Sequence, residues 1–269
     1  MTRKPGPIRA VIFDWAGTAV DFGSIAPVTA LATVFADACV PVSISEIRRP
    51  MGLEKRRHLM AILADEAVVA RWRAVHGGEP DDDDISALYD AFQTRLLEIL
   101  PQHAHPIPGL LETVTKLRAA NIRIGSNSGY SRRMIDALAP SAAAHGFAPD
   151  CIVAADEVAF GRPAPDLSNK CLQILGLEDA AAIKVDDTRP GIDEGRNAGL
   201  WTVAVAITGN EIGLSLEEWS ALDVAKRVSL RQTARERARG FGADFVIDTV
   251  AELGEAVRAI EARITGAPV

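Results

Sequence analysis

Four polar sites in this chain each follow a short apolar segment, and together their residue types could do chemistry. They are Asp14, Ser128, Arg162 and the pair Asp186 and Asp187. Asp14 is a potential nucleophile, and the Asp pair adds carboxylates suited to Mg²⁺. Arg162 is a permanent cation that could hold a phosphoryl group. These are the parts needed for phosphoryl transfer through an aspartyl phosphate.

The segment 125–129 could bind the phosphoryl oxygens. Ser128 and the backbone N–H of Gly129 lie at the expected start of a helix, where N–H groups and the helix dipole favour anions. The same segment contains Ser126. Ser128 aligns better with the end of the expected strand, but Ser126 stays open as the phosphate ligand.

Each of these sites also has an ordinary structural explanation. Asp14 could cap the next helix, and Ser128 could do the same for its own helix. Arg162 could be a surface loop residue before a proline, and two adjacent Asp residues often form a turn. The ordered combination favours function, because every one of these explanations would have to hold separately at the end of a successive strand.

The elements that must position these sites alternate along the chain. Buried strands are expected at residues 8–13, 122–127, 151–153, 182–185, 201–205 and 243–247, with helices at 110–120, 131–139, 167–175, 191–198, 217–232 and 250–264. This alternation predicts an α/β fold with a doubly wound, Rossmann-like parallel sheet. The carboxyl ends of its strands would bring the four sites to one edge.

One long segment departs from this alternation. Helical patterns are expected at residues 25–39, from Ser43 or Ser45 to 49, at 51–75 and at 85–100, with a break at 76–80. Residues 22–105 therefore read as an all-helical cap domain, inserted into a core formed by residues 1–21 and 106–269.

Composition limits the possible partners. The net charge of −7 argues against nonspecific nucleic-acid binding, and no apolar run is long enough to span a bilayer. Residues 1–7 lead into the first strand without the apolar region of a signal peptide, and the three cysteines show no paired pattern. We expect a cytoplasmic protein with a small-molecule substrate and no nucleic-acid or membrane partner.

The four signatures resemble those of the haloacid dehalogenase superfamily. They are the segment 14–18, the strand-end Ser128, the segment 161–166 and the segment 185–188. The resemblance covers residues 7–20 and 106–269, and the helical segment lies where that superfamily places its cap domain. It implies Asp14 as the nucleophile and Mg²⁺ as the cofactor. The implied metal-site positions are Asp14, Ala16, Asp187 and Asp186, with Asp187 the first choice. Gly191 stands where some relatives have a second acid, which Asp186 could supply from a different position.

Ala16 departs from the usual phosphatase pattern of this superfamily, which has a second Asp at that position as general acid and base. A leaving group would need activation in another way. Lys55 offers one, because a neutral amine can condense with an aldehyde to form a Schiff base that accepts electrons. Like charge from Arg56 and Arg57 is expected to lower its pKa. The ordinary alternative is a solvated lysine on a helix.

The combination resembles the phosphonatase family, which carries Asp-Trp-Ala-Gly-Thr, as at 14–18, and Met-Gly-Leu-x-Lys, as at 51–55. The match extends over residues 196–203. The resemblance implies that Lys55 forms an imine with phosphonoacetaldehyde while Asp14 attacks phosphorus, with Mg²⁺ and Arg162 balancing charge. It also implies roles for Met51 and His58 in imine chemistry and proton transfer. Tyr130 and Gly52 are implied as pocket positions, and the cap as the interface of a homodimer.

Two other functions stay open. The chain could be a different phosphatase or phosphomutase of the superfamily, or a non-catalytic protein that binds a phosphorylated metabolite. The intact Asp14 counts against the second.

Overall fold

A six-stranded sheet forms the centre of the computed structural model, which describes residues 3–266. Every strand pair is parallel, and the spatial order is β3-β2-β1-β4-β5-β6. The strands are β1 (Ile8–Phe13), β2 (Arg123–Asn127), β3 (Cys151–Val153), β4 (Ala181–Asp186), β5 (Trp201–Val205) and β6 (Phe245–Ile247). The predicted doubly wound α/β fold is confirmed. The strand order reverses direction at β1, and open α/β sheets bind their ligands at such a point.

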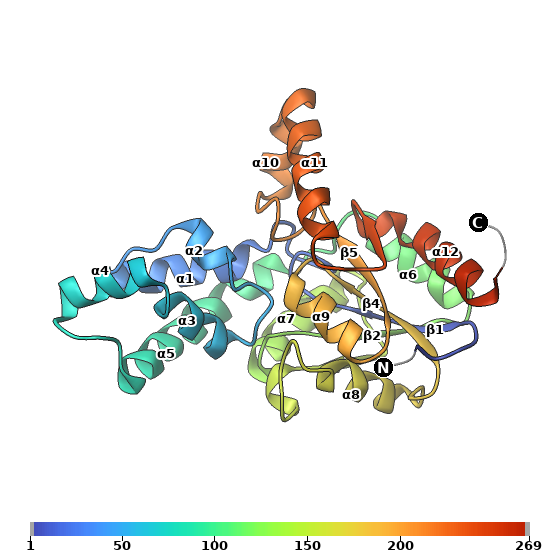
Figure 1. Ribbon diagram of the computed structural model, residues 1–269, viewed down its shortest axis with the longest axis horizontal. Helices are drawn as coiled ribbons and strands as arrows, with labels where there is room; N and C mark the ends of the chain where they lie inside the picture. Colours follow the sequence, from blue (N-terminus) through green and yellow to red (C-terminus); the bar gives the residue numbers. More distant parts are fainter. Residues whose placement is uncertain (1–2, 267–269) are drawn as a thin grey trace.

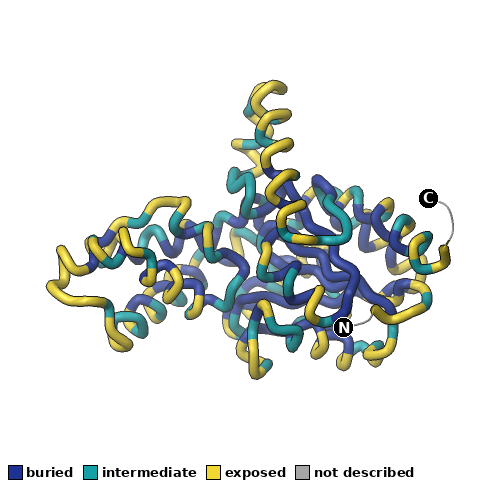
Figure 2. Tube along the Cα trace, viewed as in Figure 1, coloured by how far each residue is buried: buried dark blue, intermediate teal, exposed yellow. Residues whose placement is uncertain are grey.

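Strand β1 is apolar and buried apart from the exposed Arg9, since its faces and edges are covered from Ala10 onward. Ala10 and Ile12 pack on one face with residues of α8 (Asp166–Leu175), whereas Val11 and Phe13 belong to the core on the other face. Helix α9 (Arg189–Asn197) lies beside α8, and α6 (Leu110–Ala119) and α12 (Leu253–Thr265) cover the opposite face (Figure 1). The strands form the buried centre of the molecule (Figure 2).

The segment between β1 and β2 is helical, as expected. It contains α1 (Ile25–Asp37), α2 (Ile44–Arg48), α3 (Lys55–Leu63), α4 (Glu66–His76), α5 (Asp82–Ile99) and the 3₁₀ turn η1 (Leu100–His103). We call residues 25–103 the helical insertion. It extends to one side of the sheet in Figure 1, and its buried Leu31, Leu59 and Phe92 belong to an apolar core that continues into the sheet.

Two helices expected as single elements are each divided. The segment 51–75 forms a loop followed by α3 and α4, because the Asp65 side chain accepts the Ala67 N–H at 3.0 Å and starts a new helix. Asp223 likewise separates α10 (Leu216–Ala221) from α11 (Val224–Arg239), a pair that projects from the core (Figure 1). Apolar spacing continues across the first boundary, and α10 buries no residue that would mark the second.

The remaining expected helices and strands differ from expectation at their ends. Helix α7 (Arg132–Ala144) continues beyond the expected residue 139, and short 3₁₀ turns occur at η2 (Ala155–Glu157) and η3 (Val250–Glu252). No helix within residues 3–266 has the length and hydropathy needed to cross a membrane.

Candidate active site

The sites predicted at the strand ends meet at the carboxyl edge of the sheet. Asp14 directly follows β1, and its backbone N–H continues the ladder by donating to Val185 O at 3.0 Å. Its carboxylate is buried and accepts a hydrogen bond from Arg162 Nη2 at 2.7 Å. The same Nη2 lies 3.3 Å from Asp186 Oδ2. Asp14 after β1, Arg162 in the loop after β3 and Asp186 at the end of β4 are therefore in direct contact.

A compact carboxylate cluster occupies this edge. Oxygen atoms of Asp14, Asp186 and Asp187 all lie within 4.8 Å of one another. Thr18 Oγ1 donates to Asp187 Oδ1 at 3.1 Å, and the Asn210 N–H donates to Asp187 Oδ2 at 2.8 Å. These contacts hold the Asp187 side chain between the loop after β1, which contains Thr18, and the loop after β5, which contains Asn210.

The electrostatics of this cluster fit a divalent cation. Burial raises the pKa of Asp14, and burial together with Asp14 and Asp186 raises the pKa of Asp187 well above its ordinary range. A bound cation would offset this cost, and carboxylate oxygens are the ligands Mg²⁺ prefers. Ala16 lines the adjoining pocket and can contribute only backbone atoms. The donor set thus suits a hard cation.

Asp186 differs from Asp187 in its surroundings. Its Oδ1 accepts hydrogen bonds from the Thr188 N–H at 3.0 Å and the Thr188 hydroxyl at 2.7 Å, and its Oδ2 lies 3.2 Å from Lys184 Nζ. Burial acts to raise the pKa of Asp186, but Arg162 and Lys184 outweigh it, and the pKa lies below its ordinary value. Asp186 is therefore an ionised member of the cluster.

Arg162 is fixed from several directions. Its Nε donates to Glu194 Oε2 at 2.9 Å, and its Nη2 donates to Asn127 Oδ1 at 2.8 Å as well as to Asp14. Burial acts against its charge, but Asp14, Asp186 and Glu194 hold its pKa well above the ordinary value. This guanidinium is a permanent cation beside the Asp14 carboxylate.

A small pocket joins the core to the helical insertion. Its volume is about 20 Å³, room for roughly one water molecule. The residues that line it come from both parts of the chain: Asp14, Ala16, Ser24, Met51, Gly52, Leu53, Lys55, Ser128, Gly129, Tyr130, Arg162 and Thr188. Most of the site residues expected from the sequence therefore line one space.

Ser128 and Ser126 have different surroundings. Ser128 lines the pocket, and its Oγ accepts the Tyr130 N–H at 3.1 Å. Ser126 Oγ instead donates to Phe13 O at 3.0 Å inside the sheet. The N-cap of α7 is Ser131, so Ser128 is not needed for capping.

Lys55 is buried and faces Tyr130. It begins α3, where Glu54 accepts the N–H groups of the next two residues. Its Nζ lies 4.0 Å from Met51 Sδ and 5.0 Å from the centroid of the Tyr130 ring. Burial lowers the pKa of Lys55 to about 8. Roughly a tenth of this amine is therefore neutral at pH 7, far more than for an ordinary lysine.

The expected direction of this pKa shift is right, but the expected cause is wrong. Arg56 donates to Ser86 Oγ at 3.1 Å, and Arg57 donates to Arg162 O at 3.3 Å, so neither accounts for the shift. Desolvation dominates, and Arg162 adds to it.

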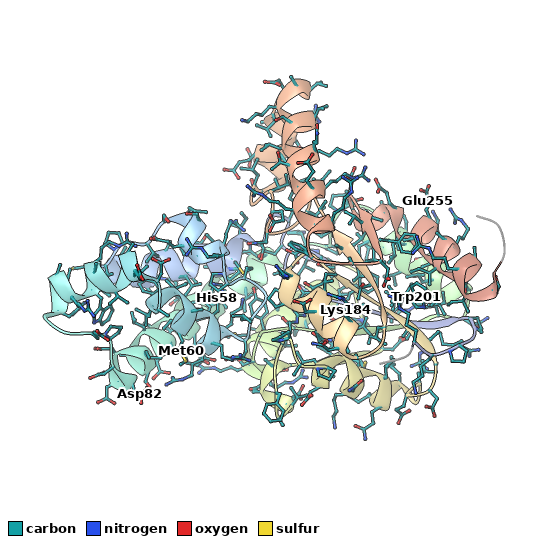
Figure 3. All side chains as sticks on the ribbon, in the orientation of Figure 1. His58, Met60, Asp82, Lys184, Trp201 and Glu255 are labelled. Atoms are coloured by element: carbon teal, nitrogen blue, oxygen red, sulfur yellow. The ribbon has the colours of Figure 1, made fainter. Side chains whose placement is uncertain are left out.

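His58 lies behind Lys55 rather than on the pocket wall. Its Nε2 is 2.7 Å from Ile47 O. Since a carbonyl only accepts, Nε2 carries the proton and Nδ1 is a free acceptor, with no hydrogen-bond partner among residues 3–266. Burial lowers the pKa of His58 to about 3, so its ring is neutral. Figure 3 shows His58 in the insertion and Lys184 within the sheet.

Two glycines allow the insertion to approach the core. Gly52 has φ +95°, and a Cβ there would lie 2.3 Å from Thr188 Oγ1. A Cβ on Gly129 would lie 2.6 Å from Leu53 O. A side chain at either position would hold the loop of residues 51–54 away from the catalytic edge.

Sequence reasoning missed several polar residues of the site: the buried Asn127, Lys184 and Glu194, and the half-buried Asn210. Lys184 gave a signal, because it is a charged residue inside an otherwise apolar strand. Glu194 gave none, since an acid on a helix usually faces solvent.

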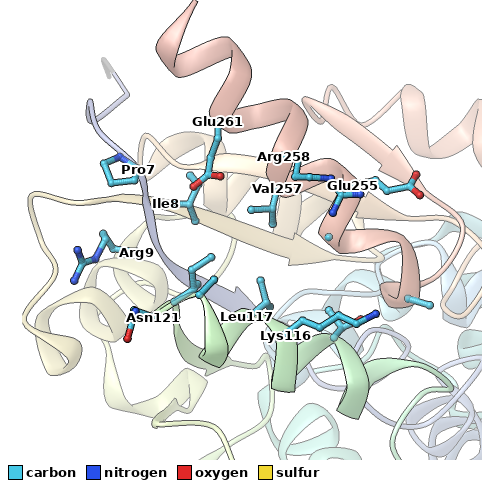
Figure 4. A pocket seen from close by; sticks show the side chains of 15 residues that line it. Pro7, Ile8, Arg9, Lys116, Leu117, Asn121, Glu255, Val257, Arg258 and Glu261 are labelled. Atoms are coloured by element: carbon cyan, nitrogen blue, oxygen red, sulfur yellow. The ribbon is translucent and has the colours of Figure 1, made fainter. Parts of the chain in front are cut away.

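A larger hollow of about 510 Å³ lies at the opposite end of β1, between α6 and α12 (Figure 4). Arg9, Lys116, Glu255 and Arg258 line it, with apolar residues beneath. None of the predicted site residues lies there.

Comparisons with known proteins agree with this geometry. The sequence profile of the haloacid dehalogenase-like hydrolases matches residues 8–199. The phosphonoacetaldehyde hydrolase of Hahella chejuensis is 49% identical over 257 residues, which cover 95% of this chain and 87% of the relative. That of Pseudomonas fluorescens strain SBW25 is 42% identical, with 97% and 96% covered.

Solved structures also show similarity to a phosphonoacetaldehyde hydrolase-like protein. A phosphonoacetaldehyde hydrolase-like protein from Oleispira antarctica superposes with a TM-score of 0.95 at 38% identity, covering 100% of this chain and 98% of that protein. A β-phosphoglucomutase from Clostridium difficile shares the fold alone, with a TM-score of 0.65 at 16% identity, covering 96% and 98%.

Proposed function

We propose that this chain, which belongs to the haloacid dehalogenase-like hydrolase family, hydrolyses the C–P bond of phosphonoacetaldehyde to acetaldehyde and phosphate. Its similarity to proteins named for this activity supports the substrate. The observation that carries the proposal is that Lys55 and Asp14 line the same pocket, with Ala16 in place of a second acid.

The first half of the reaction takes place at Lys55. Its neutral amine attacks the aldehyde carbon to give a carbinolamine, which takes up one proton and loses water to leave an iminium ion. The pKa of about 8 makes the neutral amine available without a strong base. The sulfur of Met51, 4.0 Å from Nζ, supports a role in placing Nζ. The proton-transfer role expected for His58 stays a prediction, because a pKa of about 3 makes its ring a weak base and it does not line the pocket.

The second half takes place at Asp14. A carboxylate oxygen attacks phosphorus, the C–P bond breaks, and its electron pair forms the C=C bond of an enamine while the iminium nitrogen becomes neutral. Arg162 holds the charge of the transferred group, and Ser128 with the Gly129 N–H binds its oxygens. A Mg²⁺ ion held by Asp14, Asp187, Asp186 and the backbone of Ala16 would supply further charge compensation.

Both covalent adducts then react with water. Protonation of the enamine carbon gives the imine of acetaldehyde, whose hydrolysis releases acetaldehyde and the Lys55 amine. Hydrolysis of the aspartyl phosphate releases phosphate and the Asp14 carboxylate. One water is consumed overall, because imine formation releases one.

The arrangement of the pocket supports cap movement. A space of about 20 Å³ has no room for phosphonoacetaldehyde, so substrate entry requires the insertion to move away from the core. We assign this movement to a cap domain of residues 22–105 over a core of residues 1–21 and 106–269. A homodimer formed through the cap and a cytoplasmic location remain predictions.

Borohydride trapping tests the proposed function. Reduction in the presence of phosphonoacetaldehyde should fix a two-carbon adduct on Lys55, detected by peptide mass spectrometry, and substrate-free protein should show none. Lys55→Arg keeps the charge but should lose both trapping and turnover. Lys116→Arg, on the exposed side of α6, is the matched control. Turnover by Lys55→Arg at the wild-type rate would exclude the imine mechanism.

A further inference from the structure

Glu194 is a fully buried carboxylate beside the active site that the scheme above does not use. It lies on α9, one layer behind Arg162. Its Oε2 accepts from Arg162 Nε at 2.9 Å, and its Oε1 accepts from Asn127 Nδ2 at 2.7 Å and from the Ser168 hydroxyl. Both oxygens are thus hydrogen-bonded.

Burial of the charged Glu194 carboxylate costs free energy that cations near it must offset. Burying an unpaired charge is costly, and a buried ion pair is retained only where its geometry is well satisfied. Lys184 Nζ lies 3.9 Å from Glu194 Oε2 and donates to Asn127 Oδ1 at 2.6 Å. Glu194 therefore has Arg162 as its close cation, with Lys184 as a more distant one.

The contacts of Glu194 determine how the Arg162 guanidinium is oriented. The guanidinium is planar, so fixing Nε and one Nη nitrogen fixes the direction of all its N–H groups. Glu194 holds Nε, while Nη2 contacts Asp14 and Asn127. Without the hydrogen bond from Nε to Glu194, the guanidinium could rotate about its remaining contacts. Its Nη nitrogens would then no longer point toward Asp14.

The fixed guanidinium also contacts the insertion. Arg162 Nη1 lies 3.5 Å from Gly52 O, and the Arg162 carbonyl accepts from Arg57 Nη1 at 3.3 Å. Arg162 therefore touches the nucleophile and the closed insertion at the same time. Any rotation of its side chain would disturb both contacts.

We propose that Glu194 is a positioning residue for phosphoryl transfer: by holding Arg162 Nε, it aims the guanidinium at Asp14 and at the phosphoryl group that Asp14 receives. This inference rests on the proposed function. It separates the two halves of the reaction, because Glu194 has no contact with Lys55. Glu194 therefore affects C–P bond cleavage and has no effect on imine formation.

Glu194→Gln tests this role, since it removes the charge with little change in shape. We expect kcat to fall roughly 10- to 100-fold, since misplacing a catalytic group by about 1 Å can cost about 100-fold, with a small change in KM. Trapping of substrate on Lys55 by borohydride should continue at the wild-type level. Asp193→Asn is the matched control, because this neighbour on α9 forms its ion pairs with the exposed Arg189 and Arg196, and it should leave kcat unchanged.

A double-mutant cycle with Arg162→Lys gives a second readout. Lysine has no Nε and no plane to orient, so adding Glu194→Gln to Arg162→Lys should cost little further activity. Fully additive losses, wild-type kcat in Glu194→Gln, or equal loss of trapping and turnover would each overturn the assignment. A wild-type protein that neither traps nor turns over substrate would refute the proposed function itself.

Ser168→Ala covers the case in which Glu194→Gln does not fold. It removes one hydrogen bond to Glu194 and keeps the carboxylate. The expected result is a smaller loss in kcat, again with normal trapping on Lys55, and wild-type kcat here would count against positioning through this network.

Discussion

Arg48 of the helical insertion and Asn210 of the core exchange two hydrogen bonds across the catalytic edge. Arg48 Nη1 donates to Asn210 Oδ1 at 3.3 Å, and Asn210 Nδ2 donates to Arg48 O at 3.2 Å. The backbone N–H of the same Asn210 donates to Asp187 Oδ2 at 2.8 Å. One core residue therefore links the closed insertion to the carboxylate cluster.

Arg48→Ala should weaken this link. The loss of its side-chain hydrogen bonds, including the one to Gly213 O at 3.1 Å, is worth about 1.4 kcal/mol, or roughly a tenfold drop in kcat/KM. Steady-state kinetics and limited proteolysis near residues 22 and 105, with and without substrate, would measure it. Arg49→Ala is the control, because Arg49 pairs with Asp65 inside the insertion. Equal effects of both variants would contradict a specific link.

The pH dependence of imine formation should follow Lys55. Burial lowers its pKa to about 8, so the neutral amine increases as pH rises and is largely formed above that value. The rate of borohydride trapping should therefore rise about tenfold per pH unit below pH 8 and level off above it. An ordinary lysine would continue rising to about pH 10. A rate independent of pH between about 6 and 9 would contradict the shift.

Metal binding should stabilise the folded protein. A cation bound only by the native cluster adds RT ln(1 + [L]/Kd) to the free energy of unfolding, so Tm should increase with Mg²⁺ concentration. Asp187→Asn should remove most of this increase and lower kcat by at least about 100-fold. Asp179→Asn, at an exposed surface ion pair with Lys4, should respond to Mg²⁺ as the wild type does. The prediction fails if Asp187→Asn retains the full thermal shift.

Gly52→Ala should impair closure. The residue adopts φ +95°, and its new Cβ would meet Thr188, so closure becomes unfavourable by roughly 1–3 kcal/mol. We expect kcat/KM to fall by about one to two orders of magnitude. Gly77→Ala isolates the backbone effect, because Gly77 has φ +83° and open space around it. Gly77→Ala should lower Tm slightly with normal kinetics; matching kinetic losses in both variants would disprove the steric explanation.

The sheet and its catalytic edge could be predicted because each strand carries its own local signal. Apolar runs such as residues 8–13 indicate buried strands, and parallel strands bring their carboxyl ends together whatever their order in the sheet. The positions of Asp14 and Ser128 on the pocket wall follow from that rule, whereas Arg162 lies further along the loop after β3 and is placed by its contacts with Glu194, Asn127 and Asp14.

The cause of the Lys55 shift could not be predicted in the same way. Arg56 and Arg57 are neighbours in sequence, but successive residues of a helix point about 100° apart, so they face away from Lys55. The charge that matters, Arg162, is far away along the chain. Contacts of this kind, including the one between Glu194 and Arg162, depend on the packing of distant segments and leave no local pattern.

The volume of the closed pocket limits which form of the protein this structure can represent. A space of about 20 Å³ between the insertion and the core admits roughly one water molecule and no substrate. In the proposed mechanism the imine on Lys55 and the phosphate on Asp14 therefore need a wider pocket than this one. The contacts seen here between insertion and core belong to the substrate-free protein, and each turnover begins by breaking them.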